Sequence, residues 1–281
     1  MISRIINKLR QINTLINNVA AIAKTVAGNS AGIAAKLDTS SNIWTERRNH
    51  RFKDPIYLER YGYKVYSQND EDGIIAEIFK RIGTINQTFV EFGVQDGLEN
   101  NTHYLLFQGW RGLWIECGEK KFNKLTEYFQ KPLTSKRLLV SKDFVTVENI
   151  NTIIKNSGIC GEIDLLSIDI DGNDYWVWEA INCVQPRVVV IEYNVKFPPP
   201  CEYVMPYDAE YVWDGTDCHG ASLKSFEMLA EIKGYRLVGT NTVNAFFVKR
   251  ELAEDLFPEP ATAENLYDYG QGHVVKKYIG V

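Results

Sequence analysis

The sequence predicts an α/β fold in which a mostly parallel sheet carries helices on both faces and the last strand is antiparallel. From residue 88 onward, short apolar runs alternate with segments of helical periodicity, which is typical of strand–helix–strand units. The first two runs, 88–92 and 112–116, each contain a glutamate at or near the end. A ligand-binding edge is therefore expected at the carboxyl ends of the strands.

The expected elements follow in order along the chain. The expected strands are 88–92, 112–116, 138–140, 164–168, 188–191, 235–239 and 245–249. The expected helices are 100–108, 120–129, 147–156, 175–181 and 222–233, preceded by one that Asn69 or Asp70 caps and that runs to Ile82. A short turn at 240–244 joins the last two strands, so they are expected to be antiparallel.

The segment TFVEFGVQDG, residues 88–97, is the expected centre of a binding site. Gly93 allows a tight turn and close approach of a ligand, and Gly97 closes the same turn. Glu91 ends the strand at the crevice. Glu116 follows about twenty residues after the glycine turn, where an acid hydrogen-bonds ribose hydroxyls in nucleotide-type sites. For the glycine turn alone, an ordinary strand and turn is the competing interpretation.

Composition narrows the function classes. The chain has 281 residues, a net charge of −5 and a pI of ≈ 5.5, which argues against a nucleic-acid partner bound over the whole surface. The five cysteines are scattered without a C-x-x-C pair, so reduced cysteines in a cytoplasmic protein are expected rather than a zinc site. No run of 18 apolar residues occurs, so no membrane span is expected.

The first 50 residues are expected to form an N-terminal helical extension and linker, with the main domain at 51–281. Residues 1–27 carry apolar side chains at alternating spacings of three and four, together with basic residues and no acid. Three interpretations remain open: a helix that holds a homo-oligomer together, a basic helix on an anionic membrane surface, or a helix packed on its own domain.

Two further segments approach the expected crevice. Gln68 precedes the first helix of the main domain and is placed where it can lie over the crevice. The loop at 192–220 is long enough to be functional and contains His219, a candidate general base. A loop or capping histidine is the competing interpretation of His219.

The ordered motifs resemble those of the class I S-adenosylmethionine-dependent methyltransferases, and within them the FkbM-like group, over about residues 63–250. The segment 91–97 resembles the first motif, E/D-x-G-x-x-x-G, and 166–172 (LSIDIDG) resembles the I-D-x-E-G signature with Asp171 in place of glutamate. The segment 244–248 resembles the last, antiparallel strand of that Rossmann-like sheet.

The resemblance implies S-adenosylmethionine as cofactor and methylation of a hydroxyl, with a sugar in surface polysaccharide or glycan biosynthesis as the expected carbohydrate acceptor. It places Glu116 on the ribose and Asp143 on the adenine amine. The cofactor-binding residues that we expect are Gln68, Glu91, Gly93, Gly97, Glu116, Asp143 and Asp169.

Carboxylates at the ends of the fourth and fifth strands suggest either a metal or a catalytic role. Asp169, Glu192 and the amide oxygen of Asn194 are oxygen ligands of the kind that Mg²⁺ or Mn²⁺ takes, and Asp169 and His219 are the candidate catalytic residues. In the competing interpretation, Asp169 orients the donor's amino group, Asp171 caps the next helix and Glu192 is an ordinary edge carboxylate.

Two other functions fit parts of the sequence. Asp169-Ile170-Asp171 is a D-x-D motif after an apolar strand, as in metal-dependent glycosyltransferases, although the glycine turn and Glu116 then have no role. A non-catalytic methyltransferase-like scaffold is the other alternative, and the intact acids at Glu91, Glu116 and Asp169 argue against it.

Overall fold

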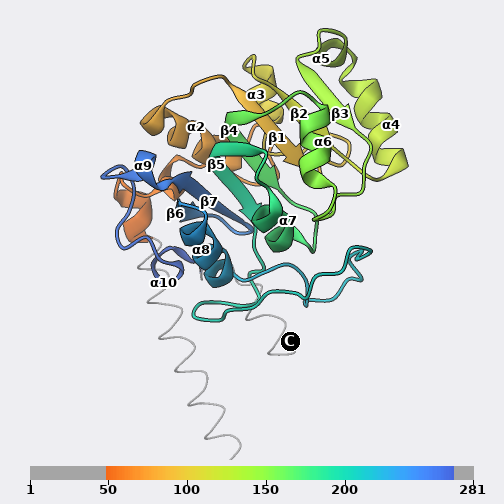
Figure 1. The fold of residues 1–281 in the computed structure, drawn as a ribbon. Coiled ribbons are helices and arrows are strands. Elements are labelled where there is room, and N and C mark those ends of the chain that lie inside the picture. The colour runs from red at the N-terminus through yellow and green to blue at the C-terminus, as the bar shows by residue number, and fades with distance from the viewer. Residues whose placement is uncertain (1–48, 269–281) are drawn as a thin grey trace, which may run out of the picture. The chain divides into compact units, whose positions relative to one another are not determined.

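The computed structural model describes residues 49–268, whose core is one seven-stranded sheet with the order β3-β2-β1-β4-β5-β7-β6 (Figure 1). The strands are β1 Thr88–Phe92, β2 Arg111–Ile115, β3 Leu138–Ser141, β4 Gly161–Ile168, β5 Val184–Glu192, β6 Tyr235–Thr240 and β7 Asn244–Lys249. β1 to β5 pair in parallel, whereas β7 is antiparallel to both of its neighbours. The predicted fold class, with its antiparallel last strand, is confirmed.

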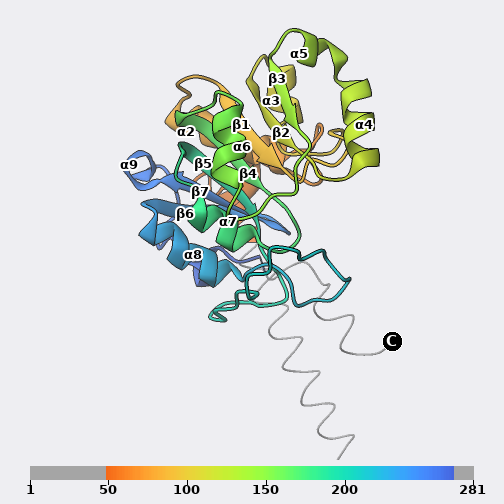
Figure 2. The ribbon, with the colours of Figure 1, turned by 45° about the vertical axis from the view of Figure 1, so that its right-hand side comes forward.

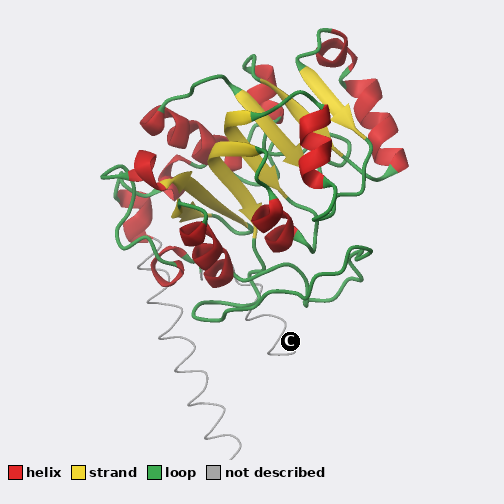
Figure 3. Ribbon diagram, in the orientation of Figure 1, coloured by secondary structure: helices red, strands yellow, loops and turns green. Residues whose placement is uncertain are grey.

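Helices cover both faces of the sheet (Figures 1 and 3). The helical elements are η1 Leu58–Tyr61, α2 Glu71–Ile82, α3 His103–Phe107, α4 Glu119–Tyr128, α5 Gln130–Thr134, α6 Ile150–Asn156, α7 Asp174–Ala180, α8 Leu223–Ile232, α9 Arg250–Ala253 and α10 Ala263–Leu266. The buried side chains of α6, α7 and α8 pack in one core, and those of α2, α3 and α4 pack in the other.

The two cores exist because successive side chains of a strand point to opposite faces of the sheet. In β1, Phe89 belongs to the core under α2 and α3, while Val90 and Phe92 belong to the core under α6 and α7. Every residue of β1 is buried, as expected for a strand covered by helices on both sides. The rigid sheet therefore fixes the positions of the residues at its carboxyl edge.

Several predicted helix starts were wrong, because side-chain oxygens accept hydrogen bonds from backbone amides of the expected first turn. α3 begins at His103 rather than at 100, since the amides of Asn101 and Thr102 donate to the buried carboxylate of Glu91. α6 begins at Ile150 rather than at 147, since Asn149 accepts from the amide of Thr146 and forms a turn there. The short helix α5 was not predicted.

The predicted N-terminal helix at 1–27 lies outside the described residues, and so do the oligomeric and membrane contacts proposed for it. Residues 51–268 belong to one compact unit. Within the described part of the chain, no helix combines the length and the apolar character that crossing a bilayer requires.

Candidate functional site

Two adjoining cavities lie at the carboxyl edge of the sheet and share four lining residues: Gly93, Gln95, Asp169 and Asp171. The first, of about 130 Å³, lies beyond β2 and β3 and is called the narrow cavity here. The second, of about 330 Å³, lies beyond β1, β4 and β5 and is called the acidic cavity. The long loop between β5 and α8 runs past the same end of the sheet (Figures 1 and 2).

Glu91 organises the loop that surrounds the acidic cavity. Its carboxylate, 4% exposed, accepts hydrogen bonds from the amides of Asn101 and Thr102 and from the hydroxyls of Thr102 and Ser167. Burial raises the pKa of Glu91, and these hydrogen bonds oppose the rise. Glu91 lines the cavity, and its carboxylate accepts four hydrogen bonds from protein groups. It therefore holds the loop between β1 and α3 in place.

Both glycines of the first motif are required by the chain itself. Gly93 has φ +81°, and a Cβ there would lie 1.5 Å from the carbonyl oxygen of Asp169. Gly97 has φ +79°, and a Cβ there would lie 2.8 Å from the rings of Phe129 and Trp114. Gly93 lines both cavities, whereas Gly97 lines neither. The close approach at Gly93 brings the β1 loop directly onto the end of β4.

Glu116 and Asp143 lie in the narrow cavity, as the sequence suggested. Glu116 follows β2 and is 5% exposed; its Oε2 accepts from the amide of Gln95 at 2.8 Å and its Oε1 from the amide of Gly118 at 2.6 Å. It thereby joins the loops after β1 and β2. Asp143 follows β3 and accepts a hydrogen bond from Ser141. Together with the shared Asp169 and Asp171, four acidic residues thus line the narrow cavity.

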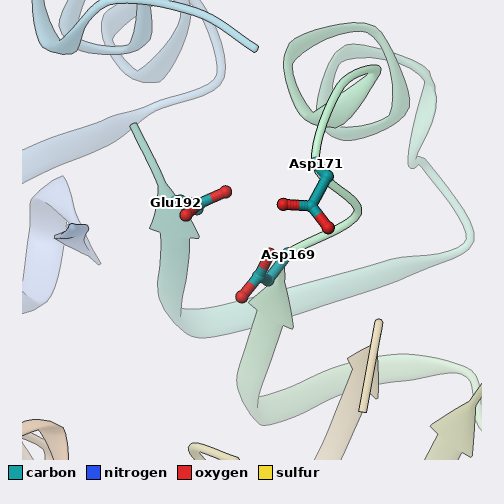
Figure 4. Close-up of side chains that lie close together, drawn as sticks. All are labelled: Asp169, Asp171 and Glu192. Carbon is teal, nitrogen blue, oxygen red and sulfur yellow. The ribbon is translucent and has the colours of Figure 1, made fainter. Parts of the chain in front are cut away.

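Asp169, Asp171 and Glu192 form a compact carboxylate cluster, with ligand oxygens within 4.8 Å of one another. Figure 4 shows Asp169 and Glu192 at the ends of neighbouring strands and Asp171 in the loop that follows Asp169, with their carboxylates turned toward one another. The register explains the pair, because Ile168 of β4 is paired with Ile191 of β5. Asp171 reaches the group through a left-handed backbone, φ +58°, which is uncommon outside glycine.

Two members of the cluster, Asp169 and Glu192, have raised pKa values. Burial raises the pKa of Asp169 well above its usual range, and the negative charges of Asp174 and Asp171 raise it further. Burial and then the charge of Asp169 do the same for Glu192. The direct interaction between the two carboxyls raises the pKa of Glu192 further and opposes the rise in the pKa of Asp169. Crowded carboxylates of this kind are relieved by a shared proton or by a cation.

This shift predicts a pH-dependent stability. The pKa of Glu192 is higher in the folded protein than in the unfolded chain. Its contribution to the free energy of unfolding is therefore fully present below about pH 4.3, the unfolded pKa. That contribution is lost as the pH rises through the folded pKa. In EDTA, Glu192→Gln is therefore expected to melt higher than wild type at pH 8, by roughly 2–4 °C per kcal/mol of relieved repulsion. The difference should shrink toward pH 4.5 in calorimetric scans, and a pH-independent difference would contradict the cause.

Asp174 fixes the loop that carries Asp171. Its buried carboxylate accepts from the amides of Ile170 at 2.8 Å and Gly172 at 2.9 Å. The capping role suggested for Asp171 is not observed, because Asn173 occupies the N-cap position of α7 and its side chain makes no capping hydrogen bond. This leaves the Asp171 side chain to face Asp169 and Glu192.

Neither Asn194 nor His219 lines the two cavities. The Asn194 amide nitrogen donates to the carbonyls of Asp217 and His219, and its oxygen accepts from the amide of Lys196. Asn194 therefore braces the long loop, and the third carboxylate beside Asp169 and Glu192 is that of Asp171. The His219 ring packs edge-on against Trp213, with 5.9 Å between the ring centroids.

Two asparagines that sequence reasoning missed line the acidic cavity, and each has a buried side-chain atom without a hydrogen-bond partner. The oxygen of Asn100 accepts from the amide of His103, which leaves its amide nitrogen without a partner. The nitrogen of Asn244 donates to Glu71, which leaves its oxygen without a partner. Both residues are more than nine-tenths buried and line the cavity. Buried polar atoms are rarely left unpaired, so this pair indicates a polar ligand. Gln68 lines the same cavity, as expected.

Tyr211, from the long loop, closes the narrow cavity. Its ring packs against Gly172, where a Cβ would lie 2.4 Å from the ring. Its hydroxyl is buried and has no hydrogen-bond partner. Burial raises the pKa of Tyr211, and the negative charge of Asp214 raises it further. An aromatic-rich loop was the only sequence signal for this residue, and its place in the cavity depends on the tertiary fold.

Comparisons with known proteins find structural likeness only. No family model and no curated protein matches the chain. Similar solved structures include a putative caffeoyl-CoA O-methyltransferase from Staphylococcus aureus, at 12% identity over 63% of this chain and 81% of that one, with a TM-score of 0.42. The N-terminal domain of EvdMO1 with bound SAH matches at 13% identity over 74% of this chain and 95% of that one, with a TM-score of 0.41.

A third similar structure is an S-adenosylmethionine-dependent methyltransferase from Clostridium acetobutylicum, at 9% identity over 62% of this chain and 88% of that one, with a TM-score of 0.39. The chain is thus similar in structure to S-adenosylmethionine-dependent methyltransferases. Its own strand order, with the antiparallel β7 between β5 and β6, defines the fold.

Proposed function

We propose that this protein is an S-adenosylmethionine-dependent O-methyltransferase of the FkbM-like kind, acting on a hydroxyl of a sugar in glycan biosynthesis. The observation that carries the proposal is the pair of adjoining cavities at the carboxyl edge. One is bordered by the acids after β2 and β3, and the other is polar and holds unpaired buried atoms. The two cavities meet at Asp169.

The narrow cavity fits the adenosine part of the donor. Val145 and Ile170 give it apolar walls for a base, while Glu116 can accept from ribose hydroxyls and Asp143 from an exocyclic amine. The unpaired hydroxyl of Tyr211 adds one more polar contact. When bound, the donor supplies an electrophilic methyl group on a positive sulfonium, and the carboxylates around Asp169 suit that charge.

The acidic cavity fits a polyhydroxylated acceptor better than a flat aromatic one. Of its 13 lining residues, only Phe92 and Gly93 lack polar side chains, whereas sites for apolar ligands are walled mainly by hydrophobic groups. The free nitrogen of Asn100 is a donor and the free oxygen of Asn244 is an acceptor. A hydroxyl can satisfy either one, because it both donates and accepts.

The acceptor hydroxyl must lose its proton as the methyl group arrives, and we infer that Asp169 accepts it. Asp169 lines both cavities, and its raised pKa makes its carboxylate a stronger base than an ordinary aspartate. Asp169, Asp171 and Glu192 also fit Mg²⁺ or Mn²⁺, since three carboxylate oxygens converge within 4.8 Å. With such an ion bound, Asp169 would act as a ligand rather than as the base, and the ion's positive charge would lower the pKa of the hydroxyl instead.

The test that separates the main alternatives is ligand binding. In titration calorimetry, S-adenosylhomocysteine is expected to bind with a stoichiometry of about one per chain, whereas nucleotide sugars are expected not to bind. Saturable binding of a nucleotide sugar without binding of S-adenosylhomocysteine would instead support a glycosyltransferase that uses Asp169 and Asp171. Failure of both ligands to bind would support a non-catalytic scaffold.

Glu116→Gln is expected to weaken S-adenosylhomocysteine binding about 10- to 100-fold, because a hydrogen bond to a charged group contributes roughly 1.5–3 kcal/mol. The matched control is Glu119→Gln, an acid of α4 that lines neither cavity and pairs with Lys142 at the surface. Calorimetry on both folded variants checks this. Equal affinities for Glu116→Gln and wild type would remove Glu116 from the donor site.

Tyr211→Phe is expected to weaken the same binding about 2- to 10-fold, because it removes the one buried hydroxyl that lacks a partner in the narrow cavity. Tyr207→Phe is the control on the same loop, since its hydroxyl already donates to Glu148 and lines neither cavity. If both substitutions change the dissociation constant alike, the effect belongs to the loop as a whole and not to the Tyr211 hydroxyl.

A further inference from the structure

A third cavity lies at the opposite edge of the sheet, at the amino ends of β1 to β4. Its volume is about 250 Å³. Thr88 begins β1, Arg111 begins β2, Arg137 directly precedes β3, and Glu162 is the second residue of β4. The narrow and acidic cavities lie at the carboxyl edge of the sheet and share no lining residue with this cavity, so it is separate from them.

Three cations border this cavity without an acidic partner. Among the ion pairs of the described residues, none includes Arg111, Lys136 or Arg137. The acid that lines the cavity, Glu162, pairs instead with Lys249 at 2.8 Å. For a chain of net charge −5, a local excess of unpaired positive charge is a distinct feature of the surface.

The sheet register holds two of these cations side by side. Gly112 is paired with Leu138, and the Gly112 amide donates to the carbonyl of Arg137 at 3.0 Å. Arg111, the first residue of β2, and Arg137, directly before β3, are therefore adjacent in register. Like charges on neighbouring strand positions destabilise a sheet, and a bound anion would remove that cost.

The remaining hydrogen-bonding groups indicate an anion rather than a neutral polar ligand. The Thr88 hydroxyl donates to Asn86 and accepts from Arg111 Nε, and the Ser157 hydroxyl donates to the carbonyl of Ile154. The terminal guanidinium nitrogens of Arg111 and Arg137 and the ammonium of Lys136 make no hydrogen bond within the described residues. The cavity therefore offers mainly positively charged donors, and guanidinium forks match the oxygens of a phosphoryl group.

We propose that this cavity is a binding site for a phosphoryl anion, either free or carried on a small molecule such as a sugar phosphate. The guanidinium groups of Arg111 and Arg137 donate hydrogen bonds to the phosphoryl oxygens, and Lys136 adds a third positive charge. The volume of about 250 Å³ exceeds the roughly 30 Å³ that one water takes in the liquid several-fold, so the cavity has room for a diphosphate. The proposal does not depend on the chemistry at the other edge.

The experiment is titration calorimetry of the full chain with inorganic phosphate, pyrophosphate and a sugar 1-phosphate, at constant ionic strength set with chloride. Saturable binding of at least one of the three is expected, with an affinity at least about tenfold lower in Arg137→Gln and in Lys136→Gln. The control is Lys124→Gln, an equal charge change on α4 outside the cavity, which should leave the affinity unchanged.

The pattern among the probes identifies the source of the phosphoryl group. Tighter binding of pyrophosphate than of the sugar phosphate supports a free anion, and the reverse order supports a carried one. The proposal is overturned if none of the three binds saturably, if Arg137→Gln and Lys136→Gln bind as wild type does, or if Lys124→Gln loses as much affinity as they do. Affinity for S-adenosylhomocysteine, measured in parallel, should be unchanged in all three variants.

Discussion

Asp169→Asn is expected to lower kcat for methyl transfer by about 10²- to 10⁴-fold, the range that general acid–base catalysis contributes. Asp169 lies where the two cavities meet, and its raised pKa suits it to accept the hydroxyl proton. Asparagine keeps the size of the side chain and removes the base. Initial rates of methyl transfer to a sugar acceptor, measured from release of S-adenosylhomocysteine, check this.

Two further variants serve as controls for the effect of Asp169→Asn on kcat. Asp214→Asn replaces an exposed aspartate on the long loop, outside both cavities, and should retain wild-type turnover. His219→Ala should also stay close to wild type, because His219 lines neither cavity. If His219→Ala loses activity while Asp169→Asn keeps it, the base is the histidine, brought in by movement of the long loop.

Removal of divalent ions is expected to lower turnover by at least about 100-fold, with recovery when Mg²⁺ or Mn²⁺ is restored. The expectation follows from the three carboxylates that converge within 4.8 Å, since an ion beside a developing alkoxide supplies several kcal/mol of stabilisation. Exhaustive dialysis against EDTA, followed by metal titration during the rate assay, measures the effect. Full activity after EDTA would leave Asp169 to act without an ion.

Direct Mn²⁺ binding gives a readout that does not depend on activity. Calorimetry should show one site per chain in wild type, weakened at least about tenfold in Asp171→Asn and in Glu192→Gln, and unchanged in Asn194→Ala if that variant folds. The affinity should rise with pH, because protons and the ion compete for Asp169 and Glu192, whose pKa values are raised. An affinity that falls with rising pH would contradict this arrangement.

The sequence by itself determined the order and type of the strands, because burial on both faces of a sheet requires short continuous apolar runs. It also predicted that Glu116, Asp143, Asp169 and Glu192 lie at one crevice at the carboxyl edge, and all four line the two cavities found there. Parallel strands bring all their carboxyl ends to one edge, so a residue that follows a strand is located as soon as the strand is recognised.

Only the tertiary structure decided which loop residues face the crevice. Asp171 joins the carboxylate cluster through its left-handed backbone and the hydrogen bonds that Asp174 makes to the loop, whereas Asn194 turns to brace the long loop. The unpaired atoms of Asn100 and Asn244 depend on partners at His103 and Glu71, the second far away in the sequence. Loop side chains take their direction from backbone angles and distant contacts, and neither is encoded in a local pattern of residue types.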